Sequence, residues 1–170
     1  ERLQEIKLIR RAYIDVAGVL PTTTEIDWFV VYNNNGYELA INHLINKYPT
    51  LLTKEYLTSD TYKRQSPVRI SNTCFARLLF YATGMSNTLA TNITVEQAKQ
   101  MLIKQALQVS TNPDEVIDYM CEVLMSRVSN AQENNMLSHK FNNALALSDE
   151  NKAWMLVVNE IIKLPDVSNK

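Results

Sequence analysis

Apolar residues recur every three or four positions along most of the chain, the spacing that places side chains on one face of an α-helix. The first such stripe consists of Leu3, Ile6, Ile9, Tyr13 and Val16, and we expect this face to be buried. No sustained alternation of apolar and polar residues, which would indicate a strand, competes with this spacing. The pattern therefore predicts an all-α fold, a compact bundle of about eight or nine helices or two small helical lobes.

A tight turn separates the first two predicted helices. Gly18 can end the first helix in the left-handed conformation, and Pro21 excludes Leu20 from the helical region. Thr22 can then begin the second helix, because Thr22 and Glu25 have the spacing of a capping box, in which each side chain binds a free backbone amide. This stretch predicts a helical hairpin.

Further helices follow in the first half of the chain. The second helix has Ile26, Phe29 and Val30 on its inner edge and ends at a run of three asparagines before Gly36. The next ones end at Pro49, at Pro67 and at Gly84. We predict them over residues 37–48, 51–65 and 70–83, and the pattern is weakest in 51–65.

A stretch rich in Ser, Thr and Asn follows Gly84 and is typical of a linker. We place a boundary there, with one lobe at 1–84 and a second at 85–170, although one continuous domain is the alternative. In the second lobe, capping signals or an apolar stripe predict four helices. They begin at Thr94, at Asn112-Pro113, at Ser129 with Gln132, and near Ser148, and Pro165 ends the last one.

The opening turn recurs faintly in the second lobe. When residues 123–133 are placed under 15–25, Leu124 aligns with Val16 and Glu133 with Glu25. Two hairpins of common design, one in each lobe, would explain this similarity, and so would chance likeness between amphipathic helices.

The first hairpin resembles the phycobilisome linker domain, whose turn has a similar Gly-x-x-Pro and acidic pattern before a glycine-aromatic step. It is also similar to S-layer-associated repeats of unknown function and to planctomycete cytochrome-associated domains that start with Arg-Arg-x-Tyr-x-Asp. The resemblance covers residues 8–62 and is carried by Tyr13, Gly18, Pro21, Glu25, Gly36, Tyr37 and Ile41. Those families place an arginine after the turn glycine, where this chain has Val19 and, in the second copy, Arg127. The resemblance implies assembly or docking and transfers no catalytic residue.

Charge and hydropathy restrict the classes of partner. The 17 basic and 18 acidic residues nearly cancel, so we expect no nucleic acid partner. The adjacent basic pairs Arg10-Arg11 and Lys63-Arg64 are expected on solvated helix faces. No apolar run approaches the roughly 20 residues that span a bilayer, so we expect a soluble chain with no membrane partner.

Residues suited to chemistry are few and scattered. His43 and His139 are isolated, and the acidic residues around Asp114 suit the positive end of a helix dipole. Cys74 and Cys121 lie in apolar helical patterns, which favours reduced core thiols, although spacing alone leaves a disulfide open. We therefore predict no catalytic residue, no cofactor and no metal site.

The sequence thus favours a non-enzymatic structural or adaptor domain that mediates protein–protein assembly, in a virion or a surface assembly, as a homo- or hetero-oligomer. The alternatives are an accessory helical domain of a larger enzyme and a small-molecule-binding helical bundle. Four aromatic residues could anchor a partner, but their helical spacing favours the core. They are Trp28, Tyr32, Tyr37 and Tyr48.

Overall fold

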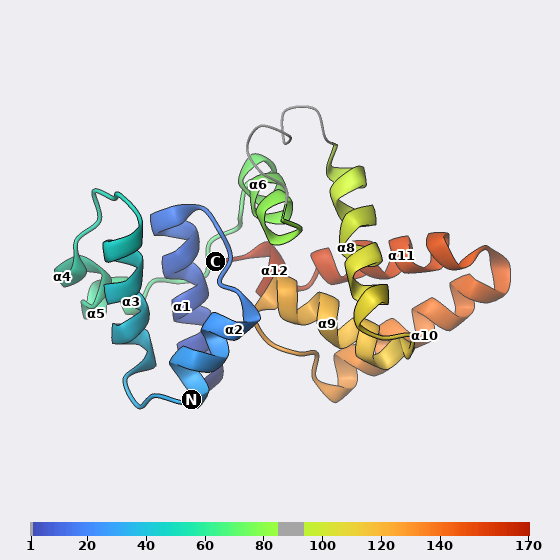
Figure 1. The fold of residues 1–170 in the computed structure, drawn as a ribbon, viewed down its shortest axis with the longest axis horizontal. Helices are drawn as coiled ribbons and strands as arrows, with labels where there is room; N and C mark the ends of the chain where they lie inside the picture. Colours follow the sequence, from blue (N-terminus) through green and yellow to red (C-terminus); the bar gives the residue numbers. More distant parts are fainter. Residues whose placement is uncertain (1, 85–93) are drawn as a thin grey trace.

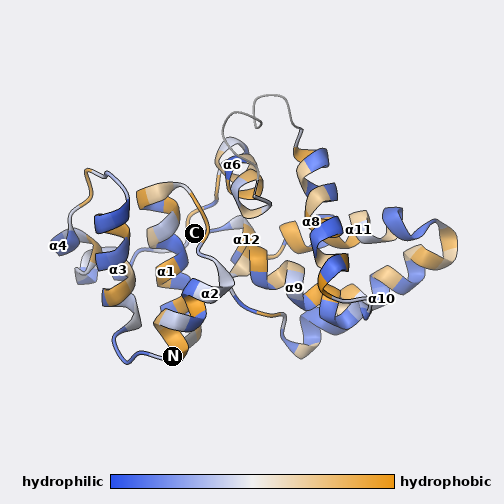
Figure 2. Cartoon of the chain, viewed as in Figure 1, coloured by the Kyte–Doolittle hydropathy of each residue, from blue (hydrophilic) through white to orange (hydrophobic). Residues whose placement is uncertain are grey.

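The computed structural model describes residues 2–84 and 94–170, and within these ranges the chain is helical without a strand (Figure 1). Within the same ranges, one isolated bridge pairs Arg69 with Asn169. The predicted all-α fold is confirmed. Hydrophobic and hydrophilic residues alternate around most helices (Figure 2), as the spacing of apolar positions predicts. None of the helices in the described ranges is both long and apolar enough to cross a bilayer.

The first half packs its helices around α1. Its elements are α1 (Arg2–Ala17), α2 (Thr23–Ile26), the π-helical turn η1 (Asp27–Val31), α3 (Gly36–Lys47), α4 (Lys54–Leu57) and α5 (Asp60–Lys63). The single helix predicted over 51–65 is wrong, because the chain forms two short helices there. The hydroxyl of Ser59 caps α5 by accepting from the amide of Tyr62, so a new helix begins at this point.

The second half is built around a larger core. Its elements are α6 (Asn72–Ala82), α8 (Val95–Val109), α9 (Pro113–Met125), α10 (Ala131–Leu147), α11 (Glu150–Ile162) and α12 (Pro165–Ser168). Trp154 on α11 is fully buried and stacks on Phe141 of α10, with ring centroids 3.9 Å apart. Pro165 does not simply end the preceding helix, because it occupies the first position of α12, where its missing amide hydrogen costs nothing.

The buried apolar residues form two main clusters. One contains residues of α1, α2, η1, α3, α4 and α5, and the other contains residues of α6 and α8 to α12. Helix α6 lies within the predicted lobe 1–84, but its Leu79 belongs to the second cluster, and its Leu78 forms a small third cluster with Ile14 of α1 and Ile70. The linker proposed after Gly84 lies outside the described residues, and whether the lobes are separate domains stays a prediction.

The same corner follows α1 and α9. Gly18 after α1 has a φ of 65°, and Ser126 after α9 has a φ of 63°. Each corner leads to a capping box, closed by Glu25 in the first copy and by Glu133 in the second. The faint sequence match is therefore a match of backbone geometry.

The second corner corrects one predicted helix start. The N-cap of α10 is Asn130 and not Ser129, because the Asn130 side chain accepts from the amide of Glu133 at 2.8 Å. The hydroxyl of Ser129 instead donates to Asp118 at 2.6 Å. The predicted box of Ser129 with Gln132 is therefore wrong by one residue.

We expect Ser126→Gly to raise the free energy of unfolding by about 0.5–1 kcal/mol. Ser126 holds a left-handed conformation, and its buried hydroxyl oxygen has no hydrogen-bond partner among the described residues. Glycine relieves both costs, and the greater freedom of the unfolded chain offsets part of the gain. Urea unfolding measures the change, and the reverse substitution Gly18→Ser should destabilise. A Ser126→Gly protein that is no more stable than the parent would contradict the strain.

Candidate functional site

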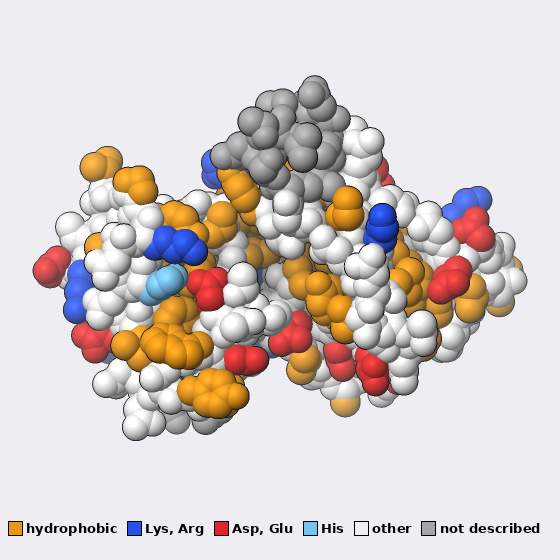
Figure 3. Space-filling view, viewed as in Figure 1, with side chains coloured by type: hydrophobic (Ala, Val, Ile, Leu, Met, Phe, Trp, Pro, Cys, Tyr) orange, Lys and Arg blue, Asp and Glu red, His pale blue; other side chains and the backbone are white. Residues whose placement is uncertain are grey.

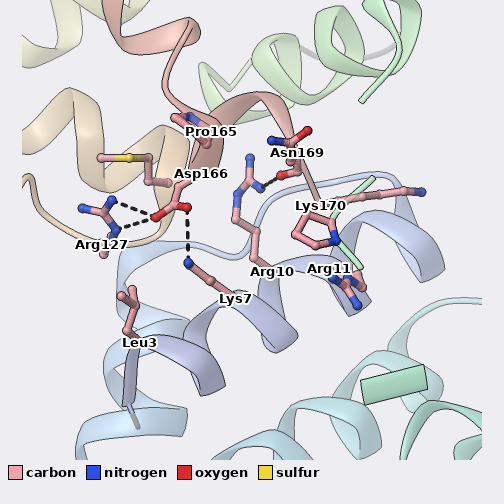
Figure 4. A pocket seen from close by; sticks show the side chains of 11 residues that line it. Leu3, Lys7, Arg10, Arg11, Arg127, Pro165, Asp166, Asn169 and Lys170 are labelled. Carbon is pink, nitrogen blue, oxygen red and sulfur yellow. Dashed lines mark hydrogen bonds and ion pairs between the residues drawn. The ribbon is translucent and has the colours of Figure 1, made fainter. Parts of the chain in front are cut away.

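A cleft of about 210 Å³ lies between α1 of the first half and the α9 and α12 region of the second (Figure 4). Cationic side chains from distant parts of the sequence line it, together with one carboxylate, and we call it the cationic cleft. The cations are Lys7, Arg10, Arg11, Arg127 and Lys170, and the carboxylate is Asp166.

Arg10 is buried at the inner wall of the cationic cleft, with 4% of its surface exposed. Its Nη1 donates to the carbonyl oxygen of Asn169 at 2.7 Å, and its Nη2 donates to that of Val167 at 3.0 Å. Its Nε has no hydrogen-bond partner among the described residues. Burial lowers the pKa of Arg10 to about 10, although the charge of Asp166 opposes the shift. The side chain still carries its positive charge near neutral pH.

Arg11 and Lys170 form two further contacts within the chain. Arg11 is 9% exposed, and its Nη1 donates to the carbonyl oxygen of Gln65 at 3.1 Å. The Nζ of Lys170 donates to Asp15 at 2.6 Å. The expectation that Arg10 and Arg11 lie on a solvated helix face is therefore wrong, since both sit against backbone carbonyl groups of other segments.

Arg127 and Asp166 form the opposite wall. Arg127 binds both carboxylate oxygens of Glu133, at 2.8 and 3.1 Å, and donates to Asp166 at 2.7 and 2.9 Å. Lys7 approaches the other oxygen of Asp166 at 3.4 Å (Figure 4). Burial raises the pKa of Asp166, but Arg127 and Lys7 outweigh burial and leave this pKa below its ordinary value. This ion-pair network joins α1, the α9–α10 corner and α12.

The second candidate site is a surface, which we call the aromatic patch. Trp28, Val31 and Tyr32 project from η1 and its C-terminal end, and half or more of each is exposed. Phe29 and Val30, on the other side of the turn, are buried. The expectation that Trp28 and Tyr32 lie in the core is therefore wrong, because a helix this short buries only one side.

The other two aromatic residues in that expectation have different positions. Tyr37 is buried, as expected, and its hydroxyl donates to the carbonyl oxygen of Leu57 at 2.6 Å. Tyr48 is half-buried beside the first core cluster. Neither contributes to the aromatic patch.

Carboxylates lie beside the aromatic patch. Asp27 is the first residue of η1, and Glu122 on α9 lies within electrostatic range of it. Burial raises the pKa of Glu122, and the neighbouring charges of Asp27 and Asp118 raise it further. Figure 3 shows hydrophobic side chains over the α2 and η1 region with acidic side chains beside them toward α9. The patch is thus apolar and bordered by negative charge.

The residues considered for chemistry are not brought together. The His43 ring lies near Phe29, with its Nε2 3.4 Å from Glu25, whereas His139 is exposed on α10. Cys74 is half-buried and Cys121 is buried, and both are free. Burial raises the pKa of Cys121 to about 12, which keeps this thiol protonated. Across the described ranges, no group of three or more His, Cys, Asp or Glu residues is arranged to hold a metal ion.

Comparison with known proteins gives no relative for this chain. No family model matches it, no curated protein matches it, and no solved structure matches it. The resemblance of the first hairpin to linker domains therefore stays a prediction.

Proposed function

We propose that this chain is a non-enzymatic adaptor domain that holds a partner protein through the aromatic patch. The observation that carries the proposal is the exposure of Trp28, Val31 and Tyr32 side by side on one short turn. Aromatic side chains of this kind dominate the binding energy of many interfaces, because they bury a large area at a small cost in rotamer entropy.

The charges beside the patch favour one class of partner. Asp27 directly precedes Trp28, and Glu122 lies within electrostatic range of Asp27, so basic residues next to apolar ones would complement this surface. An amphipathic helix that carries Leu and Lys on adjoining faces has this chemistry. The resemblance of the hairpin to linker domains implies a similar role in an assembly.

A pair of model peptides tests this proposal. The basic peptide is an amphipathic helix of leucine and lysine, and the acidic peptide replaces each lysine with glutamate. The chain has two tryptophans, of which Trp154 is fully buried and Trp28 is exposed, so a blue shift of the emission reports on Trp28. We expect the basic peptide to shift the emission saturably and the acidic peptide to leave it unchanged.

Substitution of Tyr32 separates the patch from the rest of the surface. Tyr32→Ser should weaken binding of the basic peptide about tenfold and keep the Trp28 signal. The matched control is Leu147→Ser at the end of α10, where another large apolar side chain is exposed outside the patch. An equal loss of affinity for the basic peptide in the two variants would overturn the proposal, and so would equal binding of the basic and acidic peptides. If the aromatic patch instead binds a second copy of the chain, light scattering should show a mass that rises with protein concentration. Tyr32→Ser should abolish this rise.

A further inference from the structure

The cationic cleft has more positive charge than the neighbouring carboxylates neutralise. Among the described residues, its cations pair with three carboxylates: Asp166 binds Lys7 and Arg127, Glu133 binds Arg127, and Asp15 binds Lys170. Arg10 and Arg11 donate to uncharged carbonyl groups. The cleft is therefore electrostatically suited to an anionic group.

One hydrogen-bond donor of Arg10, at the inner wall of the cationic cleft, has no acceptor among the described residues. The Nε of Arg10 is shielded from bulk water and has no partner among the described residues, and an unsatisfied buried donor is a costly arrangement in a folded protein. The ammonium group of Lys7 is partly exposed on the open side of the same cleft, 3.4 Å from Asp166. Lys7 and Arg10 lie about one turn apart on α1, whereas the side chain of Lys170 points away from Lys7 (Figure 4) and its ammonium group binds Asp15.

The rest of the lining is apolar, which restricts the ligand class. Leu3, Pro67 and Pro165 contribute hydrocarbon surface next to the cations. The cleft volume of about 210 Å³ corresponds to roughly seven water molecules at about 30 Å³ each, which suits a small organic molecule. A bare inorganic ion would leave the apolar surface uncovered.

We propose that the cationic cleft binds a small amphipathic acid. Its carboxylate lies beside Lys7 and Arg10, and its hydrocarbon body covers the exposed side chain of Leu3. The carboxylate competes with Asp166 for Lys7, so added salt weakens binding. This inference is independent of the aromatic patch, and failure of either proposal leaves the other standing.

Titration with sodium octanoate tests the proposal, with the N–H signal of the Arg10 side-chain Nε followed by NMR. We expect this signal to move saturably with octanoate. Octanol, which lacks the charge, and inorganic phosphate, which lacks the hydrocarbon, should bind at least about tenfold more weakly. Phosphate binding as tight as octanoate binding would show a general anion site and overturn the amphipathic ligand.

Two lysine variants locate the binding. Lys7→Gln should weaken octanoate binding about tenfold, because it removes a charged donor from the open side. Lys140→Gln is the matched control, since the side chains of Lys7 and Lys140 are 44% and 40% exposed and each binds one carboxylate. We expect Lys140→Gln to change the affinity less than about twofold. No saturable shift of the Arg10 signal, or equal effects of the two variants, would contradict binding in the cleft.

Discussion

Gly36→Ala is expected to destabilise the first half of the chain by about 3 kcal/mol. Gly36 begins α3 and is buried where this helix meets η1. A Cβ at this position would overlap the carbonyl oxygen of Phe29 and lie 2.6 Å from a carboxylate oxygen of Glu5. Because the main obstacle is backbone, no change of rotamer relieves it, and α3 must move away from the turn that presents the aromatic patch.

Gly84→Ala is the control for this prediction. Gly84 has a φ of 77°, and no described atom lies within 4 Å of a Cβ built there. Its replacement costs only the left-handed conformation, about 1 kcal/mol. Urea unfolding compares the two variants, and hydrogen exchange should show faster exchange in α3 than in α11 for Gly36→Ala. If both variants lose the same free energy of unfolding, close packing at Gly36 is unimportant.

Local signals predicted the helix starts well, because a capping residue acts within one turn of helix. The structure confirms the capping boxes of Thr22 and Thr94 and the start at Asn112-Pro113. The π-helical turn η1 was missed, since Asp27–Val31 has the same apolar spacing as an α-helix. The exposure of Trp28 and Tyr32 could not be predicted, because a pattern with apolar residues on both sides does not show which side meets the core.

The cationic cleft depends on contacts that are distant in sequence. Arg10 binds the carbonyl oxygen of Val167, 157 positions away, and no pattern near Arg10 indicates this partner. One signal was available: Arg10 lies four positions before Ile14, an apolar residue outside the first stripe that is itself buried, so Arg10 belongs to a second stripe of α1. The structure covers this stripe with the C-terminal segment at Arg10 and with Ile70 and Leu78 at Ile14. A charged residue on a second stripe of a central helix therefore indicates a buried polar contact.

Arg127→Met is expected to lower the free energy of unfolding by about 2–3 kcal/mol near pH 7, because it leaves Glu133 and Asp166 without their main cation. Little of the Arg127 side chain is exposed, and both of its partners are mostly buried. The matched control is Lys163→Met, which removes a mostly exposed cation from a pair with Glu160 and should cost less than about 0.5 kcal/mol. Urea unfolding followed by circular dichroism measures both.

The same variant predicts a change in the acid dependence of stability. Hydrogen bonds from Arg127 lower the pKa of Glu133, and Arg127 with Lys7 lowers that of Asp166 against the effect of burial. A carboxyl whose pKa is lowered by folding stabilises the protein above its unfolded pKa of about 4, and this contribution is lost as the pH falls through the folded value. The difference in the free energy of unfolding between the parent and Arg127→Met should therefore shrink as the pH falls from about 5 to about 3. A difference that stays constant over this range would show that Arg127 stabilises the corner by packing and not by charge.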